Sequence, residues 1–177
     1  MSGFVLFASP WWVNFLILIP IAPYLLAAKG KVGLSKMRLL GLALFGIAFG
    51  FIEAAVVVYL RDATGLWPVP QIKAVTALPA ILLRIERFRE AATIIVLVEI
   101  AFFSGQRLRE KVVAFLWTFA FWDIFYYVWL RLTIGWPGSF LSPDVLFLIP
   151  VPWVSQVWFP ILVSSLTAIA VWLRSAK

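Results

Sequence analysis

Residues 39–60 read LLGLALFGIAFGFIEAAVVVYL, an apolar run with one ionisable side chain, Glu53. About 20 apolar residues in a helix cross the hydrocarbon core of a bilayer, so this run predicts a transmembrane helix. A carboxylate at bilayer depth costs about 2.5–3.5 kcal/mol and normally faces a protein interior or a wet cavity. Glu53 therefore indicates a polar site inside a helix bundle.

The same run contains Gly46 and Gly50, which form a G-x-x-x-G pair. Small residues at this spacing let another helix backbone approach closely. Glu53 follows Gly46 by seven residues, about two helical turns, and so continues the same face. The sequence predicts that this face packs against a second helix and that Glu53 points into the bundle.

Composition extends this interpretation to the whole chain. Of its 177 residues, 64% are hydrophobic and 13% charged, with a mean hydropathy of +1.02. Soluble domains have roughly 45–50% apolar and about 25% charged residues. We expect an all-α integral membrane protein with a single transmembrane domain over residues 1–177, a bundle of five or six transmembrane helices with a broken or re-entrant outer segment. The five expected spans are residues 11–28, 39–60, the second half of a helix at 80–105, 112–130 and 153–173. Residues 69–83 are the candidate for a sixth inserted segment.

Basic residues indicate the orientation of these spans. The connections at residues 29–38 and 106–111 are rich in Lys and Arg, and cytoplasmic loops carry an excess of both. We therefore expect a multi-pass protein of the cell membrane with its N-terminus outside and its C-terminus in the cytoplasm. The bias is modest, because Arg84, Arg87 and Arg89 then fall on the outer side.

The chain contains neither cysteine nor histidine. Their absence excludes disulfides, thiolate metal sites, cysteine nucleophiles, histidine-ligated metals and imidazole acid–base chemistry. Any catalysis would have to use carboxylates, Tyr, Lys or Arg. Carboxylate ligands alone would suit Mg²⁺, Mn²⁺ or Ca²⁺, but the carboxylates lie on different predicted helices with no local ligand spacing, so we predict no metal site.

Further polar residues lie in or beside the other apolar runs. Asp123 stands in the fourth expected span, with Tyr126 and Tyr127 within hydrogen-bonding reach on the same helix face. Beyond it, Ser142-Pro143-Asp144 is a plausible helix start in an outer hairpin or half-inserted helix. The candidate ligand- or proton-binding residues are Glu53, Arg61, Arg89, Glu90, Asp123, Tyr127, Asp144 and Glu99.

These residues support more than one function. The leading hypothesis is a buried carboxylate, arginine and tyrosine cluster that binds or passes a small polar solute or a proton. One alternative is a membrane-embedded enzyme acting on a lipid or isoprenoid, and another is a non-catalytic subunit of a larger membrane complex. The same residues would also be explained as structural ion pairs that fix helix register. The sequence does not indicate which cofactor, if any, the protein binds.

The expected partners follow from composition. Membrane lipid is the first, and other membrane subunits or further copies of this chain are the second. Nucleic acid is not expected, because the net charge of +7 reflects membrane topology and attraction to anionic lipid rather than a soluble basic surface.

Four stretches carry a resemblance to other proteins: GFIEAAVVVYLR (50–61), REAATIIVL (89–97), FWDIFYYVWLRLTIGWP (121–137) and DVLFLIPVPW (144–153). They resemble segments of a group of small bacterial polytopic membrane proteins that are known only as hypothetical. The resemblance implies a bacterial source and no activity.

Overall fold

The computed structural model describes residues 8–28, 32–66, 73 and 77–175. It is mostly helical, which confirms the expected helical class. The elements in chain order are the 3₁₀ helix η1 (Trp11–Ile21), α1 (Ala22–Leu26), α2 (Lys36–Ala63), α4 (Ala80–Ser104), α5 (Leu108–Ile134), β1 (Pro143–Phe147), β2 (Trp153–Gln156) and α6 (Trp158–Arg174). Of the expected sixth segment at residues 69–83, residues 80–83 belong to α4, and residues 69–72 and 74–76 lie outside the described residues.

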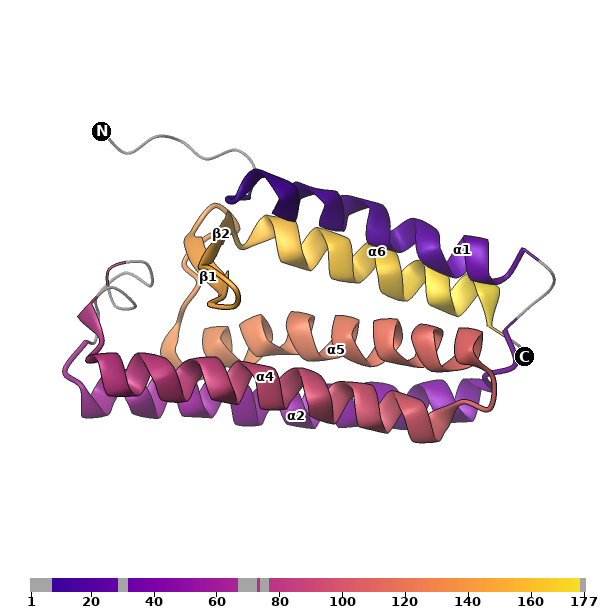
Figure 1. Ribbon diagram of the computed structural model, residues 1–177, viewed down its shortest axis with the longest axis horizontal. Helices are drawn as coiled ribbons and strands as arrows, with labels where there is room; N and C mark the ends of the chain where they lie inside the picture. Colours follow the sequence, from indigo (N-terminus) through magenta and orange to yellow (C-terminus); the bar gives the residue numbers. More distant parts are fainter. Residues whose placement is uncertain (1–7, 29–31, 67–72, 74–76, 176–177) are drawn as a thin grey trace.

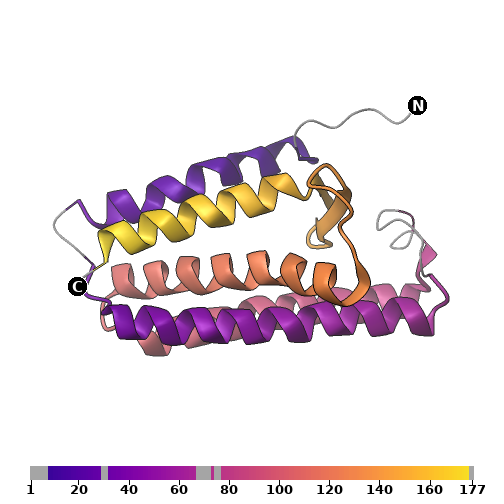
Figure 2. The same cartoon turned by 180° about the vertical axis from the view of Figure 1, so that it is seen from behind.

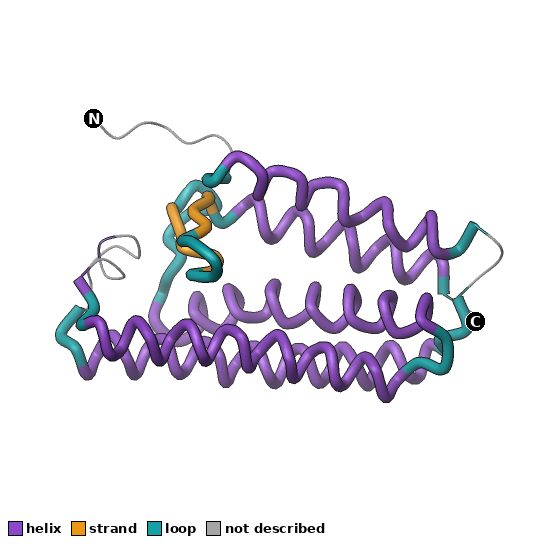
Figure 3. Tube along the Cα trace, viewed as in Figure 1, coloured by secondary structure: helices purple, strands orange, loops and turns teal. Residues whose placement is uncertain are grey.

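The helices form two layers (Figure 1). One layer holds η1, α1 and α6, and the other holds α2, α4 and α5, with α5 packed against α6. The view from behind shows the same arrangement (Figure 2), and the strands lie between the layers at one end (Figure 3). Two of the described helices, α2 and α5, are long and apolar enough to cross a membrane, while the apolar helices Trp11–Leu26 and Trp158–Arg174 are shorter.

The glycine pair of α2 packs against α5 as the sequence predicts. A Cβ atom on Gly46 would lie 2.8 Å from the carbonyl oxygen of Thr118, and one on Gly50 would lie 2.8 Å from that of Trp122. Only residues without a side chain allow so close an approach of two backbones. Glu53, on the same face, is 6% exposed, which confirms that it points into the bundle.

The segment after α5 differs from one expectation. Residues 143–147 form a strand, so a helix starting at Ser142-Pro143-Asp144 is wrong, whereas the alternative of a hairpin is confirmed. Asp144 Oδ1 accepts a hydrogen bond of 2.8 Å from the N–H of the next residue, whereas a helix N-cap would bond two or three residues ahead. β1 and β2 pair antiparallel, with Val145 opposite Val154. The fold is therefore helical with a small β-hairpin.

The end of the molecule opposite the hairpin is joined by several contacts between distant segments. Trp117 Nε1 donates to the carbonyl oxygen of Leu39 at 2.7 Å, and Lys36 Nζ donates to that of Trp172 at 2.7 Å. The N–H of Val32 donates to the Arg174 carbonyl at 3.0 Å. These bonds connect the start of α2 to α5 and to the end of α6. The polar residues described below lie at the opposite end, near the hairpin.

Candidate functional site

A cavity of about 670 Å³ lies among α2, α4, α5, α6, η1 and the hairpin. Aliphatic and aromatic side chains make most of its wall, and polar groups gather where α2, α4 and α5 face the hairpin. The charged residues that line it are Glu53, Arg61, Glu86, Arg89, Glu90, Asp123 and Asp144. Tyr126 and Tyr127 line the same part.

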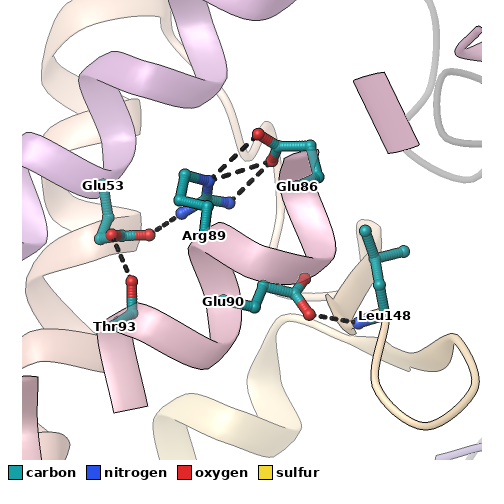
Figure 4. A network of polar contacts seen from close by, with 6 residues as sticks. All are labelled: Glu53, Glu86, Arg89, Glu90, Thr93 and Leu148. Carbon is teal, nitrogen blue, oxygen red and sulfur yellow. Dashed lines mark hydrogen bonds and ion pairs between the residues drawn. The ribbon is translucent and has the colours of Figure 1, made fainter. Parts of the chain in front are cut away.

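Arg89 on α4 joins two carboxylates (Figure 4). Its Nη1 atom pairs with Glu53 of α2, and its Nη2 atom lies 2.8 Å from Oε2 of Glu86, one helical turn away. Nε also donates to Glu86, at 3.1 Å. Thr93 Oγ1 donates to the other oxygen of Glu53 at 2.6 Å. The guanidinium thus lies between two carboxylates, and its ion pair with Glu53 connects α4 to α2.

Glu90 connects α4 to the hairpin instead. Its Oε2 atom accepts a hydrogen bond of 2.8 Å from the N–H of Leu148, in the turn between β1 and β2 (Figure 4). Glu86 and Glu90 are one turn apart, yet Glu86 bonds within its own helix while Glu90 bonds to the hairpin. Glu86 therefore orients Arg89 within α4, whereas Glu90, one turn later, fixes α4 to the hairpin.

Asp144 of β1 is the most deeply buried carboxylate of the site, with 1% of its surface exposed. Tyr127 Oη donates to Asp144 Oδ2 at 2.8 Å, and the N–H of Val145 donates to Oδ1. Burial raises the pKa of Asp144 to about 6, although these two hydrogen bonds and the charge of Arg61 favour the ionised form. Asp144 therefore changes charge near neutral pH.

Asp123 of α5 bonds differently from what its sequence neighbours suggest. Its Oδ2 atom accepts a hydrogen bond of 2.8 Å from Ser164 Oγ of α6. Tyr127, which sequence spacing places within reach of Asp123, donates to Asp144. The two tyrosines next to each other on α5 pack edge to face, with ring centroids 5.2 Å apart.

The cavity brings together seven of the eight candidate residues. These are Glu53, Arg61, Arg89, Glu90, Asp123, Tyr127 and Asp144. Glu99 lies apart from them, exposed on α4, because nine residues after Glu90 a helix has turned to roughly its opposite side. Glu99 is therefore not among the residues that line this cavity.

Polar residues that line the cavity but are missing from the sequence-based set include Glu86, Thr93 and Ser164. Helical spacing could have found two of them, since Glu86 and Thr93 lie three residues before and four residues after Arg89. Ser164 lies in an apolar run with no charged neighbour, and nothing in its local sequence marks it. No group of three or more Asp or Glu side chains suited to holding a metal ion occurs within the described residues.

Asp144 predicts a pH dependence of stability. The pKa of Asp144 is higher in the folded protein than its ordinary value of 3.8, so the folded state binds this proton more tightly than the unfolded state. The resulting contribution to stability is complete below pH 3.8 and is lost as the pH rises through about 6. Wild type should lose of the order of 3 kcal/mol of unfolding free energy over this range relative to Asp144→Asn. Unfolding in detergent at several pH values, followed by tryptophan fluorescence, measures this. Parallel pH profiles of the two proteins would contradict it.

No protein-family model, no curated protein and no solved structure matches this chain. The cavity and the residues that line it are therefore the basis for assigning a function.

Proposed function

We propose that this protein is a multi-pass membrane protein whose cavity binds a small amphiphile, with the polar end of the ligand against the charged residues near the hairpin. The observation that carries this proposal is the division of the cavity wall into a charged part and a long apolar part. A purely polar solute or a proton, the first hypothesis from sequence, would leave the apolar part unused.

The surface of the helices supports the location in a membrane. Only 33% of the most apolar stretch of α2 and 39% of that of α5 is buried, whereas a core helix of a soluble protein is mostly buried. Large apolar side chains stand on the outside of several helices, including Leu44 at 58%, Phe103 at 80% and Leu132 at 70% exposed. Such extensive apolar exposure is unfavourable in water and favourable in lipid.

The distribution of basic residues supports an orientation. Lys36 and Arg38 at the start of α2, Arg107 and Lys111 at the α4–α5 connection, and Arg174 at the end of α6 belong to the end opposite the hairpin (Figure 1). By the positive-inside rule this end faces the cytoplasm. The hairpin and the charged part of the cavity then lie toward the outside, with the N-terminus outside and the C-terminus in the cytoplasm.

The residues of α5 that line the cavity show how a ligand would lie. Tyr127 bonds to Asp144 of the hairpin, while Phe115 lies about three helical turns earlier on α5, toward the other end. The rise of 1.5 Å per residue puts Phe115 about 18 Å from Tyr127 along the helix. Apolar residues of η1 and α6, such as Leu16 and Val163, also line the wall. An extended apolar chain fits this geometry, with its polar group beside Asp123.

The proposal is tested with protein gently extracted from its own membrane. Ala91→Phe adds a ring to a cavity-lining residue of α4, whereas Ala92→Phe adds the same ring at the next, exposed position. In native mass spectrometry, wild type and Ala92→Phe should carry a stable small-molecule excess over 20.0 kDa, and Ala91→Phe should lose it. A bare wild-type chain, or an equal excess in both variants, would overturn the proposal.

Glu53→Gln provides a second test of the charged part. It replaces one carboxylate that Arg89 holds and keeps an oxygen that can accept the hydrogen bond from Thr93. We expect the variant to remain in the membrane and to retain less of the bound molecule than wild type. Equal retention by Glu53→Gln and wild type would show that the charged residues do not contribute to binding.

A further inference from the structure

Acidic side chains outnumber basic ones in the wall of the cavity. Five carboxylates face it, from Glu53, Glu86, Glu90, Asp123 and Asp144, and only two guanidinium groups, from Arg61 and Arg89. A buried charge is costly unless an opposite charge or several hydrogen bonds compensate it. The imbalance favours a positively charged group among these residues.

Neither arginine is well placed to hold an anionic ligand. All three nitrogen atoms of the Arg89 guanidinium bond to Glu53 or Glu86. Arg61 is only 6% exposed and lies within the electrostatic influence of Asp144 and Tyr126. An anionic head would have to compete with the carboxylates bonded to Arg89 and with the charge of Asp144, which acts on Arg61.

The carboxylates away from Arg89 line the cavity from three different elements. Glu90 accepts one hydrogen bond from Leu148, and Asp123 accepts one from Ser164. A carboxylate can accept about four, so both keep capacity for a ligand. Asp144 completes the set from the hairpin side. The three groups come from α4, α5 and β1, three different walls of one cavity.

Aromatic side chains complete this part of the wall. Tyr126, Tyr127, Trp122 and Phe147 line the cavity near the carboxylates, and aromatic faces attract ammonium groups. Trp122 is only 8% exposed, and its indole N–H is buried with no hydrogen-bond partner among the described residues.

We propose that the ligand is a cationic amphiphile, an amine or quaternary ammonium group on an apolar chain, whose nitrogen lies among Glu90, Asp123 and Asp144. This inference rests on the proposed function, since it specifies the head group of the amphiphile in the same cavity. The apolar chain lies along α5 toward Phe115.

The test compares ligands that differ only in their head. Purified protein in maltoside detergent is titrated with dodecyltrimethylammonium, dodecanol and dodecyl sulfate, and bound probe is counted by native mass spectrometry. We expect dodecyltrimethylammonium to bind with a dissociation constant at least about tenfold below those of the other two. Tetramethylammonium, which has no chain, should bind far more weakly. If it binds as tightly as the long-chain probe, the ligand is a small cation and not an amphiphile.

Variants show whether the carboxylates cause the preference. Glu90→Gln and Asp123→Asn each remove a charge while keeping an oxygen that can accept the hydrogen bond from Leu148 or Ser164. Together they should bring the three dissociation constants to within about threefold of one another. Glu99→Gln, an exposed position on α4, should behave like wild type. A preference for the cation that survives the double variant would overturn the inference.

The same experiment separates failure of this inference from failure of the proposed function. If the three heads bind equally and Ala91→Phe abolishes all binding, the cavity binds amphiphiles without regard to charge and only the inference is wrong. If no probe binds in a way that depends on Ala91, both are wrong. Dodecylphosphocholine distinguishes two sources of the ammonium group: binding as tight as that of dodecyltrimethylammonium assigns a choline lipid, and weaker binding assigns a simple amine.

Discussion

Arg89→Met should destabilise the protein by about 3–5 kcal/mol, because it removes the cation that lies between two buried carboxylates. Glu53 is 6% exposed and Glu86 is 7% exposed, so neither can recover full hydration when the guanidinium is lost. Unfolding in maltoside micelles, followed by tryptophan fluorescence, measures the loss. Arg87→Met removes an exposed arginine of the same helix and should cost less than about 1 kcal/mol.

A double-mutant cycle separates this ion pair from general effects of substitution. Glu53→Gln in the Arg89→Met background removes one of the two carboxylates that Arg89→Met leaves without a cation. The combined cost should therefore be smaller than the sum of the two single costs, by about 0.5–3 kcal/mol. Additive costs, or equal costs for Arg89→Met and Arg87→Met, would show that the pair does not hold α4 against α2.

Replacing the glycines between α2 and α5 should have the second large effect. A Cβ on Gly46 or Gly50 would lie 2.8 Å from a backbone carbonyl oxygen of α5, and a backbone cannot move aside as a flexible side chain can. Overpacking of this kind costs about 1–3 kcal/mol at each position. Gly46→Ala and Gly50→Ala should therefore each lower the free energy of unfolding. Together they should increase the distance between the axes of α2 and α5.

Gly41 supplies the matched control on the same helix. No atom lies within 4 Å of a Cβ built there, and the position is exposed. Alanine is the better helix former by about 0.5–1 kcal/mol, so Gly41→Ala should leave stability unchanged or raise it. In the same unfolding assay, we expect Gly50→Ala to lower the free energy of unfolding and Gly41→Ala not to lower it. Destabilisation of equal size at both would mean that helix packing is not the cause.

The sequence was most informative where a property depends on one helix. The expected span at residues 39–60 lies within α2, and that at 112–130 lies within α5. Helical spacing was sufficient to predict the close packing at Gly46 and Gly50 and the inward direction of Glu53. The same spacing put Glu99 opposite Glu90, so its exposure on α4 agrees with the periodicity, although apolar neighbours had suggested a buried role.

The sequence was least informative where a side chain can bond either to its own helix or to a distant one. Thr118 and Thr167 both donate to a carbonyl four residues earlier, while Ser164 donates to Asp123 across the cavity. Nothing in the three local sequences distinguishes these choices. The β-hairpin was uncertain for a related reason, since Asp144 before a short apolar run can begin a helix or a strand until its partner strand is known.

The ion pair between Glu86 and Arg89 also bears on how the chain enters a bilayer. The two residues are three apart in α4, so the pair forms as soon as this segment is helical, before any other helix is present. In the proposed orientation the N-terminal half of α4, which contains Glu86 and Arg89, has to be moved across the membrane during biogenesis. During this step Arg89 is already paired with Glu86. Its translocation therefore does not require the second ion pair, with Glu53 of α2.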